Sequence, residues 1–418
     1  MKKKLPYGIS NYETLIEDNY IFIDKTKHIE ILENSHAPYI FFLRPRRFGK
    51  SLFTSVLENY YDVNKKGEFK RLFGDTYIGK NPTNKQGDYH ILKFNFSGLI
   101  TDNKESLVKS FSSTCFKSYD RFMEDYNLDF EYDKTGYPSD VFNSFLSKVS
   151  FKINKPIYVV IDEYDHFANE LLSFKTDMFE EIISKTGFVR KWYEVLKIGT
   201  ESVVKRIFAT GVSPITLDSL TSGFNIASDM TRDSRLNGMI GFTEEEVRHL
   251  IVNVLKKELD RNELDNLVEE LRKNYNGYLF SENGKDRLFN SDMILYYLKS
   301  YEDFGQGPKE LIDKNIASDY SKLGKMFDLK NKDSNMKVLD KILNGEELVT
   351  NITSQFSMEK DFEEDDFKSL LFYLGMLTIE REDLGDVILI VPNNIIRELY
   401  FDFFGKKLKE EMEYSICW

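Results

Sequence analysis

The chain has 418 residues, enough for two or three domains with buried cores, and its 41% hydrophobic and 30% charged residues are typical of a globular protein. The formal net charge of −12 argues against a protein that coats nucleic acid over its whole surface. The 57 lysines and arginines still leave room for a local basic groove.

Targeting and membrane signals are not expected. The basic run at the N-terminus is not followed by an apolar stretch, so we predict no secretory signal. No run approaches the roughly 18 apolar residues that a membrane-spanning helix needs. The two cysteines, Cys115 and Cys417, are far apart and lack metal-type spacing, which predicts a reduced, cytoplasmic protein.

The first recognisable unit is an apolar run followed by an amphipathic segment. Residues 38–43, PYIFFL, are rich in aromatic and β-branched side chains and predict a buried strand. Residues 50–61, KSLFTSVLENYY, repeat apolar side chains at helical spacing. A strand, a tight turn and a helix in this order form the context in which a phosphate-binding loop occurs.

Three more predicted strands alternate with helices. The strands are 90–96, 156–162 and 204–210, and the helical patterns between them are 104–125 and 176–198. This alternation predicts an α/β domain with a largely parallel sheet.

The second half of the chain changes to a mostly helical pattern. The polar segment 221–242 is expected to close the α/β domain, and Thr243 with Glu246 forms a capping box that marks the start of a helix. Residues 376–393 predict a β-hairpin, which together with the helices suggests a winged-helix-like region. The predicted parts are an N-terminal segment packed on the core (1–35), the α/β domain (36–242) and the helical region with its hairpin (243–418).

The turn after the first strand carries the sequence Gly-Lys-Ser. Taken alone this triplet is a weak signal, but its position between a strand and a helix is the one that a phosphate loop requires. A helix N-terminus offers N–H groups and partial positive charge to phosphate oxygens. Lys50 would then reach the β- and γ-phosphates of a nucleotide, and the hydroxyl of Ser51 would bind Mg²⁺.

This loop has Arg-Pro where a phosphate loop usually has its first glycine. Pro45 favours an extended conformation at Arg44, so we expect the strand to run one residue further. The loop then turns with Gly49 as its one permissive position, while Arg46 and Arg47 add positive charge beside the anion. The predicted nucleotide-binding residues are Arg44, Pro45, Arg46, Arg47, Phe48, Gly49, Lys50, Ser51 and Leu52.

An acidic pair ends the predicted strand 156–162. The sequence IYVVIDEYD places Asp162 and Glu163 at the carboxyl end of the strand, where open α/β sheets bind ligands. Asp162 would hold Mg²⁺ through water, and Glu163 would polarise the water that attacks the γ-phosphate. A solvated acidic turn is the alternative interpretation.

Other polar residues are weaker candidates. Thr210 either positions the attacking water or only caps the turn after its strand, and Ser213 is the second candidate for this role. None of the five histidines shows paired metal-ligand spacing. The candidates for an activating arginine, which the sequence does not rank, are Arg206, Arg232 and Arg235.

Together these motifs resemble the bacterial AAA-ATPase-like family. The similar stretches include YGISNYETLIEDNYIFIDKT, FLRPRRFGKSLF, IYVVIDEYD, FATGVSPITLDSLTSGFNI and GFTEEEV, and they follow the family's order from about residue 5 to 403. Arg-Pro-Arg-Arg-Phe-Gly-Lys-Ser is the usual phosphate loop of that family. The resemblance implies a P-loop ATPase of the additional-strand, catalytic-glutamate type with sheet order 5-1-4-3-2, and it alone implies adenine instead of guanine.

Members of that family commonly carry a C-terminal PD-(D/E)XK nuclease-like domain. Some 15 residues follow Phe403 in this sequence, and they contain no Asp…Glu-x-Lys core. We therefore do not expect this chain itself to cleave DNA.

Two functions from different classes remain open. The first is a Mg²⁺-dependent ATPase that switches the orientation of its C-terminal region, alone or in a homo-oligomer, in a mobile-element or defence context that only similar architectures imply. The second is a nucleotide-stabilised scaffold that holds DNA or a protein partner through the C-terminal region with negligible turnover. The acidic net charge counts against the DNA form, and no membrane role is predicted.

Overall fold

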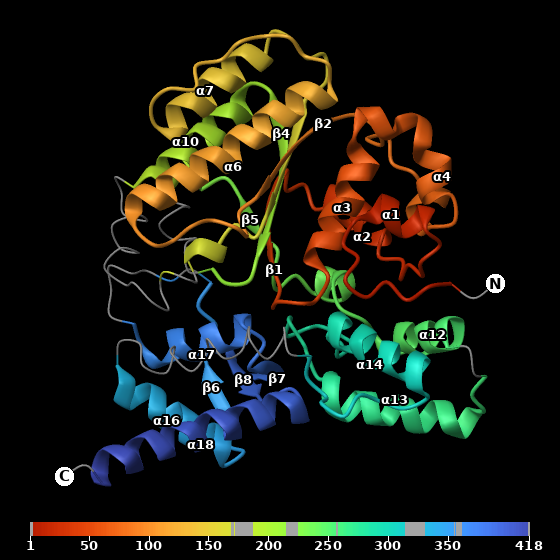
Figure 1. Cartoon of the computed structure of the whole chain (residues 1–418), viewed down its shortest axis with the longest axis vertical. Coiled ribbons are helices and arrows are strands. Elements are labelled where there is room, and N and C mark those ends of the chain that lie inside the picture. The colour runs from red at the N-terminus through yellow and green to blue at the C-terminus, as the bar shows by residue number, and fades with distance from the viewer. Residues whose placement is uncertain are drawn as a thin grey trace.

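A five-stranded parallel sheet forms the centre of the N-terminal half (Figure 1). The computed structural model describes residues 3–168, 171, 187–214, 225–255, 258–313, 331–354, 356 and 362–416. The strands are β1 (Tyr39–Leu43), β2 (His90–Asn95), β3 (Ile157–Asp162), β4 (Val204–Gly211) and β5 (Ser228–Asp229). Their order is β5-β1-β4-β3-β2, and every pair is parallel, so the predicted order 5-1-4-3-2 is confirmed.

Helices cover both faces of this sheet, as Figure 1 shows. One face carries α6 (Lys104–Asp125), α7 (Pro138–Val149) and α10 (Phe188–Glu201). The other carries α3 (Lys50–Tyr61) and a group of short helices, namely α1 (Tyr12–Glu17), α2 (Lys27–Asn34), the 3₁₀ helix η1 (Val63–Glu68), α4 (Phe69–Phe73) and α5 (Tyr77–Lys80). With both faces covered, all six residues of β3 are buried, which explains its unbroken apolar run.

Two of the predicted helices, 50–61 and 104–125, have the predicted bounds. The third prediction, 176–198, overlaps α10 from residue 188, and its part before residue 187 lies outside the described residues. The indole of Trp192 on α10 is fully buried and stacks on Phe142 of α7 at 4.8 Å between ring centroids. Its edge-on contact with Phe94 of β2, at 4.9 Å, fixes these helices on the sheet.

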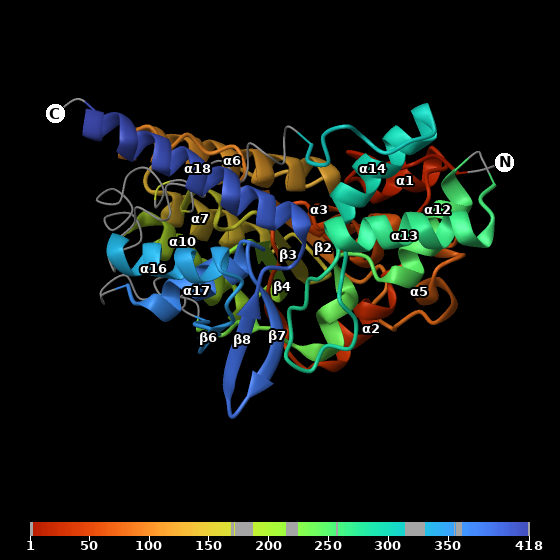
Figure 2. The same ribbon diagram turned by 90° about the horizontal axis from the view of Figure 1, so that it is seen from below.

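The C-terminal half contains a group of helices and a small antiparallel sheet. After the 3₁₀ helix η2 (Ser234–Met239) come α12 (Glu244–Val254), α13 (Arg261–Tyr275), α14 (Ser291–Phe304), α16 (Lys332–Leu343), α17 (Glu364–Tyr373) and α18 (Asn394–Ile416). The sheet has the order β6-β8-β7, with β6 at Leu348–Thr350, β7 at Thr378–Asp383 and β8 at Asp386–Ile390. The β7–β8 pair confirms the predicted hairpin, and Figure 2 shows it pointing away from the rest of the chain.

The larger of two hydrophobic clusters among the described residues extends across both halves, and the smaller one joins Ile21 to α12, α13 and α14. The larger cluster extends from Tyr12 to Tyr400 and includes Phe48 together with Tyr278 and Phe280. Among the described residues, no helix is both long and apolar enough to cross a membrane.

The predicted capping box at the start of α12 is confirmed and can be tested by mutation. Glu246 N donates to Thr243 Oγ1, and the Glu246 carboxylate accepts from Thr243 N at 2.8 Å and from Lys25 Nζ at 2.6 Å. We expect Thr243→Ala to lower the free energy of unfolding by about 1 kcal/mol, because an N–H of the first turn loses its acceptor. Urea unfolding measures this, with Thr243→Ser as the matched control that keeps the hydroxyl. Equal stability of Thr243→Ala and the wild type would contradict the assignment.

Candidate nucleotide site

The loop between β1 and α3 lies at the carboxyl edge of the parallel sheet. Arg44 N donates to Gly211 O at 3.2 Å, so the β-ladder continues one residue beyond β1, as the sequence predicted. Gly49, with φ of 100°, precedes α3, and within the described chain no side chain caps this helix. An uncapped helix N-terminus is a favourable position for a phosphate group.

One detail of the predicted loop is wrong. Arg47 also has a positive φ, 69°, so Gly49 is not the only residue of the loop in the left-handed region. A non-glycine residue in this region costs on the order of 1–2 kcal/mol. The N-terminus of α14 offsets this cost, because Ser291 Oγ and Asp292 N both donate to Arg47 O, at 3.4 and 3.2 Å.

Lys50 lies buried at the centre of the site. Its Nζ donates to the carbonyl oxygens of Arg44 and Pro45, both at 3.1 Å, and lies 3.8 Å from Glu163 Oε1. The ammonium group therefore joins the loop to the acidic end of β3. A charged group held by neutral carbonyl oxygens can exchange them for phosphate oxygens, which bind it more strongly.

Glu163 is held as a carboxylate. Burial opposes its ionisation, but Lys50, His166 and Arg46 together outweigh burial and lower the pKa of Glu163 to about 2. Its backbone has φ of 54°, so the chain turns sharply where β3 ends. An ionised carboxylate at this position can accept a hydrogen bond, and a proton, from a water molecule.

Asp162 and Ser51 fit a magnesium site. Asp162 is buried, Ser51 hydrogen-bonds its side chain, and Asp162 Oδ1 has no hydrogen-bond partner among the described groups. Burial raises the pKa of Asp162, and the neighbouring charge of Glu163 adds to the effect. A buried carboxylate oxygen without a partner is costly unless a ligand completes it. One carboxylate and one hydroxyl are donors that Mg²⁺ accepts together with phosphate oxygens.

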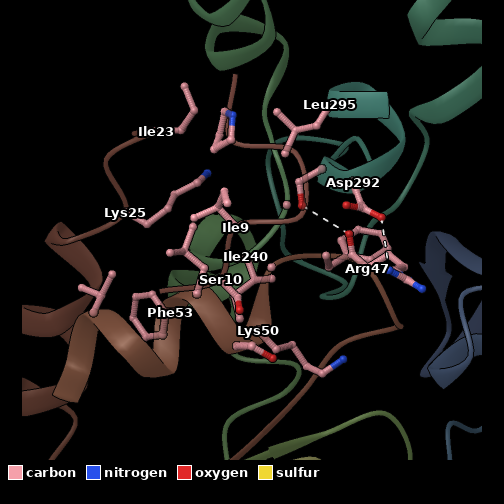
Figure 3. Close-up of a pocket in the computed structure, with 18 of the residues that line it drawn as sticks. Ile9, Ser10, Ile23, Lys25, Arg47, Lys50, Phe53, Ile240, Asp292 and Leu295 are labelled. Atoms are coloured by element: carbon pink, nitrogen blue, oxygen red, sulfur yellow. Dashed lines mark hydrogen bonds and ion pairs between the residues drawn. The ribbon is translucent and has the colours of Figure 1, made fainter. Parts of the chain in front are cut away.

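A cavity of about 480 Å³ opens beside this edge, a volume suited to a small-molecule ligand. Figure 3 shows Lys50 in the lower part of the view, Ile9 near the centre, Ile23 with Lys25 at the upper left and Leu295 with Asp292 at the upper right. Its polar lining includes Arg46, Arg47, Ser51, Glu163 and Asp292, and its apolar lining also includes Ile240 and Leu250. The cavity thus combines charged and apolar side chains, contributed by the loop before α3, the N-terminal segment and the C-terminal helices.

Most of the predicted loop residues line this cavity, namely Arg46, Arg47, Phe48, Gly49, Lys50, Ser51 and Leu52. Arg44 and Pro45 do not line it. The Arg44 guanidinium lies over the rings of Phe42 and Phe280, at 4.2 and 4.3 Å, and donates to Thr231 O at 2.8 Å. Burial lowers the pKa of Arg44 to about 9. Its side chain joins the sheet to the C-terminal half instead of facing the cavity.

The other predicted candidates lie outside the cavity. Thr210 Oγ1 donates to Phe42 O on the neighbouring strand β1 at 2.7 Å, a cross-strand contact that differs from both roles predicted for it. Ser213 contacts the Asp165 carboxylate at 3.1 Å. Arg206 lies near the amino-terminal end of β4, at the opposite end of that strand from Thr210.

The two remaining arginine candidates pair with acidic neighbours. Arg232 pairs with Glu282, and Arg235 with Asp233 at 2.6 Å. Neither of them lines the cavity within the described part of the chain.

Several cavity residues were not found from the sequence. The segment 1–35 was predicted only to pack on the core, yet Ile9, Ile23 and Lys25 line the cavity. Asn95 also lines it, and its register partner in the sheet is Asp162. The sequence did offer a signal for Asn95. It is a polar residue near the carboxyl end of the predicted strand 90–96, and the carboxyl ends of parallel strands lie at the same edge of a sheet as Asp162.

Known proteins with similar sequences or structures include a family, a bacterial relative and two solved structures. Residues 6–221, just over half of the chain, match the AAA-ATPase-like family, described as predicted AAA-ATPase. An uncharacterised protein from the vnfD 5′ region of Azotobacter chroococcum mcd 1 is 26% identical over 315 residues, which are 71% of this chain and 52% of that protein. The chain thus spans about half the length of this relative.

Two Aeropyrum pernix structures align with most of the chain. The ORC1 protein in complex with DNA is 9% identical with a TM-score of 0.34, over 96% of this chain and 95% of that one. The ORC2 protein, in ADPNP–ADP complexes, is 10% identical with a TM-score of 0.36, over 94% and 98%.

The buried oxygen of Asp162 predicts a trade-off between stability and ligand binding. We expect Asp162→Asn to raise the free energy of unfolding without nucleotide by about 1–2 kcal/mol, because an ionised group whose pKa is raised by burial is replaced by a neutral amide. The same variant should lose the extra stabilisation that Mg²⁺ adds to nucleotide. Thermal unfolding with nucleotide, with and without Mg²⁺, measures both effects. An unchanged response to Mg²⁺ would contradict the metal assignment.

Proposed function

Because the chain belongs to the AAA-ATPase-like family, we propose that it binds ATP with Mg²⁺ in the cavity beside Lys50 and hydrolyses it to ADP and phosphate. The observation that carries this proposal is the meeting of two distant motifs at one sheet edge. Lys50 Nζ lies 3.8 Å from Glu163 Oε1, and Ser51 hydrogen-bonds Asp162. Each motif alone has an ordinary structural interpretation, but their contact is the arrangement that phosphoryl transfer needs.

The residues divide the reaction between them. The N-terminus of α3 and Lys50 bind the phosphates, and apolar side chains of the cavity such as Ile9 and Leu295 contact the base. Glu163 accepts a proton from a water whose oxygen attacks the γ-phosphorus, while the bond to the β–γ bridging oxygen breaks and ADP leaves. Mg²⁺ at Ser51 and Asp162 would neutralise part of the phosphate charge.

Two substitutions separate binding from hydrolysis. We expect Glu163→Gln to bind ATP as tightly as the wild type but to lose at least about 100-fold in kcat, because an amide cannot accept the proton. Lys50→Ala should lose ATP binding itself. Glu245→Gln, on the exposed first turn of α12, is the matched control and should keep full turnover. Normal hydrolysis by Glu163→Gln would show that the base is misassigned.

The phosphate loop also supports a switching role. Arg47 Nη1 lies 3.7 Å from Asp292 Oδ2 at the start of α14, and both residues line the cavity (Figure 3). A triphosphate bound beside Lys50 brings negative charge toward Asp292 and competes with it for the guanidinium. Nucleotide binding therefore weakens the Arg47–Asp292 contact and changes how α14 is held. In this way the C-terminal half senses whether the site is filled.

This competition predicts that Asp292 lowers the affinity for ATP. We expect Asp292→Asn to bind ATP about 5- to 10-fold more tightly, because the repulsion is removed while the hydrogen bond from its backbone N–H to Arg47 O remains. Isothermal titration calorimetry measures this. Asp303→Asn, on the same helix about 16 Å away along its axis, removes the same charge from an exposed position and should bind as the wild type does. Equal affinity in both variants would contradict the switch.

The alternative function, a nucleotide-stabilised scaffold with negligible turnover, receives less support if its partner is DNA. The hairpin that a winged-helix-like region would present to DNA carries Glu380, Glu382, Asp383 and Asp386, against Arg381. A phosphate backbone is repelled by such a surface. A protein partner for the C-terminal half remains compatible with this charge.

A further inference from the structure

Glu163 has a second neighbour besides Lys50. His166 Nδ1 lies 3.8 Å from Glu163 Oε2, on the other oxygen from the one that faces Lys50. His166 N also donates to Glu163 O at 3.2 Å, so a tight turn fixes the separation of the two residues. Both side chains line the cavity. The imidazole therefore contacts the carboxylate that we assign as the base.

Nucleotide binding makes this second contact important. Lys50 is the proposed phosphate ligand, so a bound triphosphate attracts its ammonium group and draws it away from Glu163. Glu163 directly follows β3 and has a left-handed backbone, with φ of 54°, so its side chain leaves the chain at a sharp turn. A carboxylate that must face one water molecule needs a fixed neighbour, because small errors of position reduce the rate strongly.

Asp165 does not compete for this role. Its carboxylate accepts hydrogen bonds from Val212 N and Ser213 N, at 3.0 and 2.7 Å, and so holds the turn after β4. His166 is thus the side chain of this turn that faces Glu163 within the cavity.

We propose that His166 is a positioning residue for Glu163, whose Nδ1–H donates to Oε2 and directs Oε1 toward the attacking water. The 3.8 Å separation is longer than a hydrogen bond, and such contacts commonly tighten when the substrate binds. This role rests on the proposed ATPase function.

The proposal predicts a specific kinetic pattern. His166→Ala should lower kcat about tenfold and leave KM for ATP within about twofold, because the imidazole acts on the base and not on the nucleotide. His166→Asn should recover most of the lost rate, since its side-chain N–H lies close to the position of Nδ1. In a Glu163→Gln background, His166→Ala should cause no further loss, because no carboxylate remains to be positioned.

The experiment is steady-state ATP hydrolysis by the full chain and these variants, with ATP binding measured alongside as a check of folding. A wild type that hydrolyses ATP, with an unchanged kcat in His166→Ala, would overturn the role of His166 alone. So would a variant that raises KM and keeps kcat, since that pattern marks a nucleotide contact. A wild type without turnover would overturn the ATPase function and this role with it.

Discussion

The phosphate loop is packed between the two halves of the chain, and the site depends on this packing. Phe48 lies edge-on against Tyr278 and Phe280, with ring centroids 4.9 and 5.4 Å apart. Pro45 lies so close to Gly375 that a Cβ there would come within 2.9 Å of the proline ring. A loop whose only function was to surround a phosphate would favour glycines. This loop also packs against the C-terminal half, which explains why it contains the large side chains of Pro45 and Phe48.

The same packing holds the costly features of the site in place. Arg47 keeps a left-handed backbone because the first turn of α14 bonds its carbonyl oxygen, and Asp162 keeps a buried oxygen with no hydrogen-bond partner in the described part of the chain. Proteins retain such energetically unfavourable features mainly at functional sites, where ligand binding can compensate for them. Lys50 and Glu163 face each other across the edge, so their charges balance each other in this structure, and in the proposed mechanism a bound nucleotide redistributes them.

The sequence predicted what depends on local pattern. Helices 50–61 and 104–125 were found because their apolar periodicity is strong, whereas β5 was missed because Ser228–Asp229 is two polar residues long. Arg44 was assigned to the nucleotide because it belongs to the predicted phosphate loop, but aromatic rings brought together only by tertiary packing bury its guanidinium. Asp292 joins the site from some 240 residues away, and no local signal marks it. The strand order and the family came from the resemblance, not from periodicity.

The central claim is that the phosphate loop transmits nucleotide binding to the C-terminal half. Hydrogen–deuterium exchange of the full chain, measured without nucleotide, with Mg²⁺–ADP and with a Mg²⁺-bound non-hydrolysable ATP analogue, tests it most directly. We predict that exchange changes in the loop around Gly49 and also in peptides from 278–298, where Tyr278 and the start of α14 contact it. The change should differ between the two nucleotides. Changes confined to the loop and the first turns of α3 would contradict this account.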